Sequence, residues 1–166
     1  MPGGCVSRIG HSGPGERSSL MNIGRRVDYA VRALLYLAAQ PAGQVVSRRE
    51  IQRRQDIPAH FLSKIMRDLV VRGLVQSRIG LKGGFSLARP ATAITIKDIY
   101  EAVEGPLTVM ECIDHGEAYC WFSSVCTQIS IWNKAQSIVG SYLATVSIAD
   151  IADREGLRER LISLRG

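Results

Sequence analysis

Residues 57–74 read IPAHFLSKIMRDLVVRGL, and this stretch decides how the chain folds. Pro58 suits the first turn of a helix, because a proline lacks the amide hydrogen that would be unpaired there. Apolar side chains then recur at helical spacing until Gly73, where we expect the helix to stop. They are Phe61, Leu62, Ile65, Met66, Leu69 and Val70. The stretch therefore predicts an amphipathic helix.

Two helices are expected before this stretch. From Arg25 to Gln40 the apolar positions again follow helical spacing, and Pro41 and Gly43 end the run. The segment 47–50 reads SRRE, the pattern of a capping box, in which Ser binds a free amide at the helix start and Glu reaches back. It predicts a short helix that ends near Gln55.

A hairpin is expected after the same stretch. Two short strands, Leu74–Arg78 and Phe85–Ala88, flank the tip GLKGG at 80–84. A tight turn is enough to explain Gly83 and Gly84. Three helices followed by a β-hairpin are typical of a winged helix-turn-helix.

The second half of the chain is expected to be helical. A capping box at 95–98, TIKD, begins a fourth helix that ends near Gly105, and SIAD at 147–150 begins a last one. Between them a long helix is predicted from about Val125 to Val146. Its apolar positions form a seam suited to packing along another helix: Val125, Trp132, Val139 and Val146, with Ala135 and Tyr142.

Charge is distributed unevenly along the 166 residues, whose net charge is +6. Residues 21–90 hold 13 basic and 4 acidic side chains, for +9, whereas residues 91–166 hold 6 basic and 10 acidic ones, for −4. The first half is therefore expected to face a polyanion, although an arginine-rich surface alone gives the same count. No apolar run is long enough to cross a membrane, and residues 1–20 lack a secretory signal pattern, so a cytoplasmic protein is expected.

The third helix carries a polar face that we call the reading face: His60, Ser63, Lys64 and Arg67. A recognition helix needs such donors and acceptors to point into the major groove, although an ordinary surface helix has the same periodicity. Six arginines are expected to contact phosphates. They are Arg25, Arg26, Arg48, Arg49, Arg53 and Arg54. Arg78 and Lys82 on the wing are expected to reach a minor groove.

Three of the four cysteines, Cys112, Cys120 and Cys126, lie within 15 residues as C-x7-C-x5-C. A disulfide framework is not expected in a cytoplasmic chain. The spacing fits structural zinc poorly, because zinc sites usually contain close cysteine pairs. Soft thiolates suit an iron–sulfur cluster that takes a fourth ligand from elsewhere. Inert thiols or a thiol redox switch remain open alternatives.

Four segments together resemble a known family: VDYAVRALLYLA (27–38), IPAHFLSKIMRDLVVRGLV (57–75), GLKGGFSLARPA (80–91) and ECIDHGEAYCWFSSVC (111–126). From Met21 to about Ala152 the chain is similar to the winged-helix regulators that include IscR, NsrR and RirA. The resemblance implies a homodimer joined by the long helix, a palindromic double-stranded DNA operator, and a cluster whose state controls DNA affinity.

The resemblance also suggests the ligands. The cysteine spacing looks most like that of RirA, an iron-responsive repressor. IscR has a histidine ligand where this chain has Ile129, whereas NsrR takes an aspartate from the first helix of the partner subunit, where this chain has Asp28. Asp28 is thus the expected fourth ligand, followed by Asp114 and His115, and the set favours a 4Fe–4S over a 2Fe–2S cluster.

The predicted fold is mainly α with a small β-hairpin: a winged helix-turn-helix domain plus a long C-terminal dimerisation helix. The expected parts are a disordered tail (1–20), the DNA-binding domain (21–90), a linker helix with the cluster-binding loop (91–127), and the dimerisation helix with a C-terminal helix (128–166). The expected function is that of a cluster-dependent transcriptional regulator, acting as a repressor and responding to iron, nitric oxide or redox state. The alternative is a cluster-free regulator that senses thiol oxidation or a protein partner. An enzyme is not expected, because the sequence has no nucleotide-binding loop and no evident nucleophile–base pair.

Overall fold

The computed structural model describes residues 23–80, 82–115 and 120–153. Four parts of the chain with sequence-based expectations lie outside these ranges. They are the tail of residues 1–20, residue 81 at the hairpin tip, residues 116–119 of the cysteine segment, and the end of the C-terminal helix.

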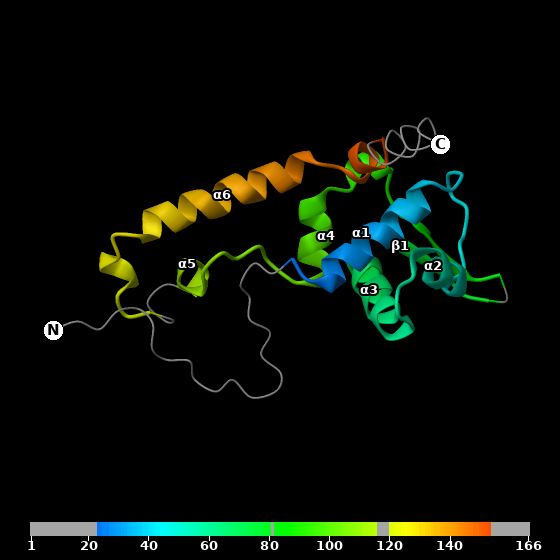
Figure 1. The fold of residues 1–166 in the computed structure, drawn as a ribbon, viewed down its shortest axis with the longest axis horizontal. Coiled ribbons are helices and arrows are strands. Elements are labelled where there is room, and N and C mark those ends of the chain that lie inside the picture. Colours follow the sequence, from blue (N-terminus) through cyan, green and yellow to red (C-terminus); the bar gives the residue numbers. More distant parts are fainter. Residues whose placement is uncertain (1–22, 81, 116–119, 154–166) are drawn as a thin grey trace, which may run out of the picture.

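Four helices form the folded domain on the right of Figure 1. They are α1 (Arg25–Ala38), α2 (Arg48–Gln55), α3 (Ala59–Val71) and α4 (Ile96–Val103). Each turns apolar side chains inward, and removing a large apolar side chain from water contributes about 1.5–3 kcal/mol. The largest fully buried side chains are Leu34, Val46, Ile51, Ile57, Leu62, Ile65, Met66, Leu69, Leu74, Ile94, Ile99 and Ile148. The spacing of apolar residues thus predicted the core-facing side of α3 correctly.

The three predicted capping boxes form to different extents. At the start of α4, Thr95 accepts from the Asp98 amide and Asp98 accepts from the Thr95 amide, so both bonds are present. The pair Ser147 and Asp150 does the same. At α2, Ser47 accepts from the Glu50 amide, but the Glu50 carboxylate accepts from the Tyr36 hydroxyl at 2.9 Å instead of reaching back. The sequence-based prediction of a reciprocal box at Ser47 was therefore half right.

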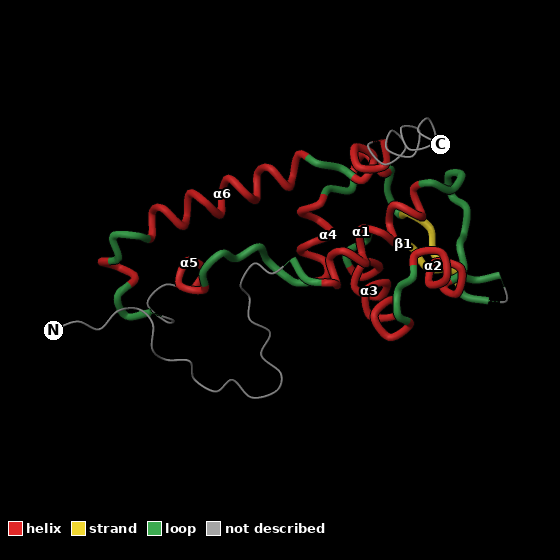
Figure 2. The backbone as a smooth tube through the Cα atoms, in the orientation of Figure 1, coloured by secondary structure: helices red, strands yellow, loops and turns green. Residues whose placement is uncertain are grey.

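The wing is a two-stranded antiparallel hairpin, drawn yellow in Figure 2, of β1 (Val75–Arg78) and β2 (Gly84–Leu87). Val46 pairs with the other edge of β2, since Val46 and Phe85 exchange two backbone hydrogen bonds of 2.8 Å. A Cβ atom on Gly84 would lie 2.2 Å from the Val46 carbonyl oxygen. Glycine is required at position 84 because a third segment passes close to it, and a tight turn alone, which the sequence suggested, does not account for it.

The long helix α6 (Ile129–Thr145) extends away from this domain (Figure 1). Its C-terminal part packs on α4 through partly buried Val139 and Leu143. The helix begins four residues later than predicted, because Ser123–Val125 form the 3-10 helix η3 and Cys126 is extended. A short helix that the sequence did not predict, α5 (Glu111–His115), lies beside α6. Another 3-10 turn, η1, spans Ala91–Ala93, and residues 148–153 are helical.

The described part of the chain is mostly helical with one two-stranded hairpin, so the predicted fold class is confirmed. Within these residues, no helix is both long enough and apolar enough to cross a bilayer.

Candidate nucleic-acid interface and cysteine segment

The reading face lies on the solvent-exposed side of α3. His60, Ser63, Lys64 and Arg67 are all exposed, and the Arg67 side chain is 72% exposed. The opposite side of the helix is fully buried in the core. The domain therefore holds α3 by its apolar side and presents four polar side chains outward, which is the arrangement that a major groove requires.

The first turn of α2 contacts this face directly. Arg48 donates to the Ser63 hydroxyl over 3.1 Å, and Ser63 donates to the Ala59 carbonyl over 2.9 Å. Arg48 and Arg49 also line an open groove beside the turn between α2 and α3, together with Arg53. The structure therefore brings three of the six predicted phosphate-contacting arginines next to the predicted base-contacting helix.

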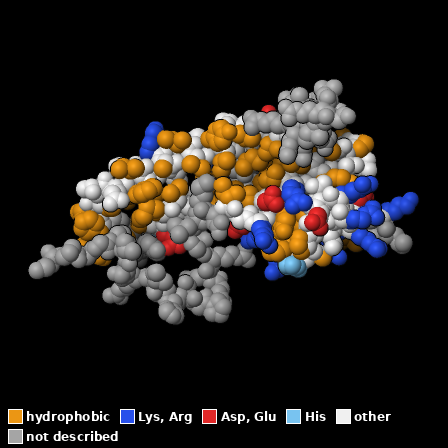
Figure 3. All heavy atoms as spheres, in the orientation of Figure 1, with side chains coloured by type: hydrophobic (Ala, Val, Ile, Leu, Met, Phe, Trp, Pro, Cys, Tyr) orange, Lys and Arg blue, Asp and Glu red, His pale blue; other side chains and the backbone are white. Residues whose placement is uncertain are grey.

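The wing adds further positive charge. Arg78 ends β1, where it pairs with Gly84 across the hairpin, and both Arg78 and Lys82 are exposed. Figure 3 shows that most Lys and Arg side chains on this face of the molecule gather over the end that holds α2 and the hairpin. The apolar side chains on the same face lie mainly along α6.

Arg26 is a correction to the sequence-based expectation of a phosphate contact. Its side chain is 20% exposed and lies 2.9 Å from an Asp68 oxygen and 3.5 Å from a Glu104 oxygen. It therefore joins three helices of the domain. Charge alone could not reveal this, because its two partners lie far away in the sequence.

The three cysteines of the predicted cluster site have half-buried side chains. Cys112 lies on α5, and Cys120 and Cys126 lie on either side of η3. Within the described ranges, no three Cys, His, Asp or Glu side chains are arranged so that they could hold a metal ion. A single chain in this conformation thus has the donor atoms for a cluster but does not bring them together.

Hydrogen bonds hold the segment before Cys112 against its surroundings. The Val109 amide donates to the Gln136 side chain of α6 over 2.8 Å, and the Thr108 hydroxyl donates to Asp114. Asp114, His115 and Gln136 line an open groove between α4, α5 and α6. Gln136 is not among the residues predicted from the sequence, because its partner lies 27 residues away.

Asp28, the predicted fourth ligand, has a side chain that is 60% exposed and lies 3.6 Å from Arg32, one turn along α1. The resemblance places this ligand in a partner subunit, so a single chain does not test it and Asp28 stays a prediction.

Apolar side chains are exposed along α6 and near the cysteines. Val139 was expected in the free seam but packs against the core. The exposed stripe instead consists of Ile131, Ile138 and Tyr142, which are 57–63% exposed, with half-buried Ala135 between the first two at helical spacing. Trp121, Phe122, Val125 and Trp132 are also exposed.

A comparison with family models matches residues 23–154 to "Rrf2: Iron-dependent Transcriptional regulator". This range covers more than three quarters of the chain and runs from the start of α1 past the end of α6. The chain belongs to the Rrf2 family. The family resemblance inferred from the four sequence segments is confirmed.

Relatives within the Rrf2 family are transcriptional regulators. The chain is 30% identical over 146 residues to the HTH-type transcriptional regulator NsrR of Oceanobacillus iheyensis, covering 88% of this chain and 97% of that protein. It is 33% identical over 131 residues to protein rrf2 of Nitratidesulfovibrio vulgaris, covering 79% and 87%. The name of the first relative describes a transcriptional regulator and not an enzyme, as the sequence predicted.

Solved structures show the same architecture. CymR, described as the global cysteine regulator of B. subtilis, superposes with a TM-score of 0.63 at 25% identity and covers 81% of this chain and 98% of its own. IscR of T. potens gives the same TM-score and identity, covering 81% and 88%. The protein is thus a DNA-binding transcriptional regulator of the Rrf2 family with a winged-helix fold.

Proposed function

We propose that this Rrf2-family regulator is a homodimeric repressor whose DNA affinity is set by an iron–sulfur cluster on Cys112, Cys120 and Cys126. The observation that carries the proposal is the position of three half-buried cysteine side chains in one segment between the DNA-binding domain and α6. A change in this segment acts on both neighbours, because α5 and α6 are in contact and α4 leads directly into it.

DNA recognition is assigned to the reading face of α3 and to the wing. The reading face enters the major groove, where Arg67 and Lys64 donate to base edges. Arg48 and Arg49 at the start of α2 contact phosphates, and Arg78 and Lys82 contact the adjacent minor groove. In a twofold dimer the two α3 helices meet half-sites about one helical turn apart, or a multiple of that spacing, so the operator is a palindrome.

Dimerisation is assigned to the exposed stripe of α6. Heptad-like apolar positions that face water in one chain become buried when a second copy of the helix packs on them. This stripe is offset from the seam proposed from the sequence, because Val139 is already used within the chain. Cys126 lies three residues before α6, so the cluster site lies beside the proposed dimer contact.

The side chains of the three cysteines are chemically suited to hold an iron–sulfur cluster. Three thiolates are soft ligands of the kind that hold such clusters, and a fourth ligand completes a 4Fe–4S site. We assign that position to Asp28 of a second copy, since a hard carboxylate oxygen holds iron less firmly than a thiolate and can leave first. The cluster, when bound, supplies the chemistry that responds to iron supply, nitric oxide or oxygen. The chain supplies the response, because residues 112–126 must close up to bring the three thiols together.

Anaerobic purification tests the cluster. We expect brown protein that contains iron and sulfide in comparable amounts, and a Cys120→Ser variant that is colourless but still folded. The matched control is Cys5→Ser, which changes the one cysteine outside the segment and leaves the colour intact. Colourless wild-type protein that binds its operator tightly would rule the cluster out.

Asp28→Ala tests the fourth ligand. We expect the variant to bind a cluster that oxygen or a chelator destroys faster than in the wild type. Identical spectra and identical rates of cluster loss would remove Asp28 from the ligand set.

A second candidate is a cluster-free regulator that senses thiol oxidation. Two observations favour it: the three cysteines are not grouped for metal binding within the described residues, and the chain is similar to the cysteine regulator CymR. Colourless protein whose operator affinity changes on oxidation, with a disulfide between two of the three cysteines in mass spectrometry, would select this candidate. Protein that needs iron and sulfide for tight binding would reject it.

A further inference from the structure

The geometry points to Arg26 as a positioning residue that links the end of α4 to the recognition helix α3. Through Arg26, a change in the conformation of the cysteine segment alters the reading face. This inference rests on the proposed function, because it concerns how the cysteine segment changes DNA binding. It assigns to Arg26 a role other than the phosphate contact that its charge suggested.

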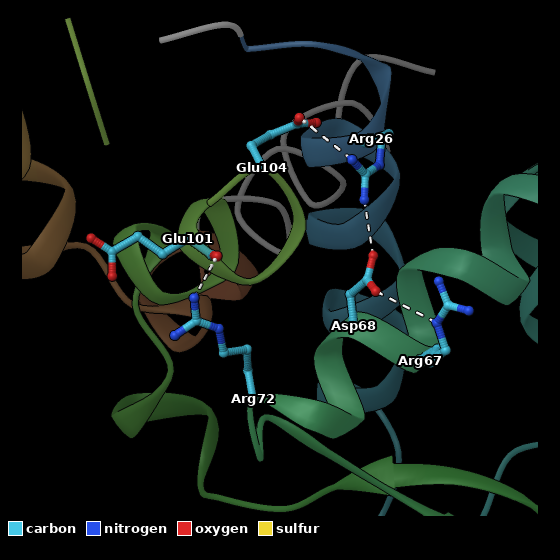
Figure 4. A network of polar contacts seen from close by, with 6 residues as sticks. All are labelled: Arg26, Arg67, Asp68, Arg72, Glu101 and Glu104. Atoms are coloured by element: carbon cyan, nitrogen blue, oxygen red, sulfur yellow. Dashed lines mark hydrogen bonds and ion pairs between the residues drawn. The ribbon is translucent and has the colours of Figure 1, made fainter. Parts of the chain in front are cut away.

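Arg26 holds two carboxylates that belong to different helices (Figure 4). One terminal nitrogen, Nη2, donates to Asp68 Oδ2 of α3 at 2.9 Å, and the other, Nη1, lies 3.5 Å from Glu104 Oε2 at the end of α4. The three side chains are only 20–24% exposed, so water and salt screen these contacts less than they screen a surface ion pair. The planar guanidinium also fixes the direction of both contacts, which a lysine ammonium does not.

Asp68 connects this contact to DNA recognition. It follows Arg67 on α3, and its second oxygen, Oδ1, lies 3.7 Å from Arg67 Nε. The carboxylate is therefore shared between a guanidinium inside the domain and one on the reading face. When Arg26 holds Asp68 firmly, Arg67 is freer to turn toward a base; when Arg26 is withdrawn, Asp68 attracts Arg67 instead.

Glu104 connects the same contact to the cysteine segment. It is the C-cap residue directly after α4, and Gly105 follows with φ +97°, a turn that sends the chain toward α5 and Cys112. A carboxylate at the C-terminal end of a helix is disfavoured by the helix dipole, so Glu104 gains from staying close to a cation. A pull on residues 105–112 therefore moves the Glu104 end of the link first.

A second contact between α3 and α4 determines how the two helices can move relative to each other. The Arg72 side chain at the end of α3 donates to the Glu101 backbone carbonyl over 3.3 Å. This bond holds α3 to α4 at one point, while Arg26 joins them at another through side chains alone. Movement of Glu104 thus changes the orientation of α3 relative to α4 while the Arg72 contact is kept.

Operator affinity in two forms of the protein tests the inference. The probe is a duplex carrying the palindrome that the wild-type protein selects from a random-sequence library. Its affinity is measured for anaerobically purified protein and for the same protein after its iron is chelated, or for reduced and oxidised protein if the preparation is colourless. The ratio of the two affinities measures the coupling, which in allosteric proteins is typically about 5- to 150-fold.

Glu104→Gln is the main variant, because it removes the negative charge, keeps the shape of the side chain and leaves the Arg26–Asp68 bond in place. We expect the affinity ratio to fall close to one while the unfolding midpoint stays near that of the wild type. Arg26→Gln should also lower the ratio and weaken binding in both forms, because Asp68 is then free to hold Arg67. The double variant should lower the ratio no further than Arg26→Gln does, since both changes break one link.

Lys97→Ala is the matched control. Lys97 lies on α4, 3.8 Å from Glu101 in an ion pair within that helix, and its removal should leave the ratio unchanged. If the wild-type ratio is above fivefold and Glu104→Gln leaves it unchanged, the inference is overturned and the proposed function is not. The same holds if Glu104→Gln lowers the unfolding midpoint but leaves the ratio unchanged. A wild-type ratio of one in both pairs of states would overturn the proposed function and this inference with it.

Discussion

At the scale of single residues, Gly84 shows how closely the wing is fitted to the domain. A Cβ atom there would lie 2.2 Å from the oxygen and 2.6 Å from the carbon of the Val46 carbonyl. Both are backbone atoms, so relief requires β2 and the Val46 segment to move apart. We expect Gly84→Ala to lower the free energy of unfolding by about 1–3 kcal/mol, as forced overpacking usually does, measured by urea titration.

Gly140→Ala is the control for this prediction. A Cβ there would lie 3.5 Å from a Leu107 methyl group, an ordinary contact, and Gly140 is inside α6. Because alanine favours a helix over glycine by about 1 kcal/mol, this variant should be as stable as the wild type or more so. Equal stability of Gly84→Ala and the wild type would show that β2 does not need the close approach of Val46.

Tyr36 makes stability depend on alkaline pH. Its hydroxyl donates to Glu50, and this hydrogen bond, followed by burial and the negative charge of Glu50, raises the pKa of Tyr36 above its usual 10.0. Because the pKa is raised in the folded state, the contribution of this group to stability is complete below about pH 10. It is lost as the pH rises through the higher pKa of the folded protein. We expect the unfolding midpoint of the wild type to fall in that range more steeply than that of Tyr36→Phe. Parallel curves would contradict the assignment.

Some side-chain partners could be predicted from the sequence and others could not. Ser47 and Asp98 act within one helical turn, so their caps follow from local spacing. Glu50 bonds to Tyr36, 14 residues away, and Arg26 bonds to Asp68, 42 residues away. Such pairs depend on which helix faces the fold brings together, and local sequence patterns do not predict this.

At the scale of elements, α3 provides the sharpest test of DNA recognition. Arg67→Ala removes an exposed guanidinium from the reading face, and we expect a loss of about 1–3 kcal/mol in specific binding with relaxed choice at one base position. Binding to random duplexes should change much less. Lys134→Ala removes one charge from the exposed side of α6 and should leave both affinities unchanged. Wild-type binding by Arg67→Ala would exclude Arg67 from base contact.

Long elements were predicted better than short ones. The apolar periodicity of α1 and α3 extends over several turns, so it specified both helices, and in α3 it also specified the buried face. The five residues of α5 are too few to show a period, and a loop was expected there. For α6, the apolar residues at steps of seven predicted a helix correctly, but they did not predict which face is free, because Val139 packs against the core.

At the scale of the whole molecule, charge and hydrophobicity separate along its length. The basic side chains gather over α2 and the hairpin, while exposed apolar side chains follow α6 (Figure 3). The uneven charge of the two halves of the sequence predicted which half carries the basic side chains. The complete ligand set did not follow from the sequence, since a ligand contributed by a second copy depends on how two chains pack. The position of the exposed stripe on α6 therefore bears on the cluster site as well as on the dimer.

Ile138→Glu tests that stripe. Ile138 is 57% exposed in the single chain, so a charge there should not disturb the fold, but in a helix pair it would be buried without a partner. We expect sedimentation to give the mass of one chain, 18.2 kDa, where the wild type gives twice that mass. Because one α3 then holds only one half-site, operator affinity should fall far more than the affinity for a single half-site. Ser137→Glu adds the same charge at an exposed position on another side of α6 and should remain dimeric. A dimeric Ile138→Glu protein would place the contact elsewhere and would leave Asp28 of the second copy without a route to Cys112, Cys120 and Cys126.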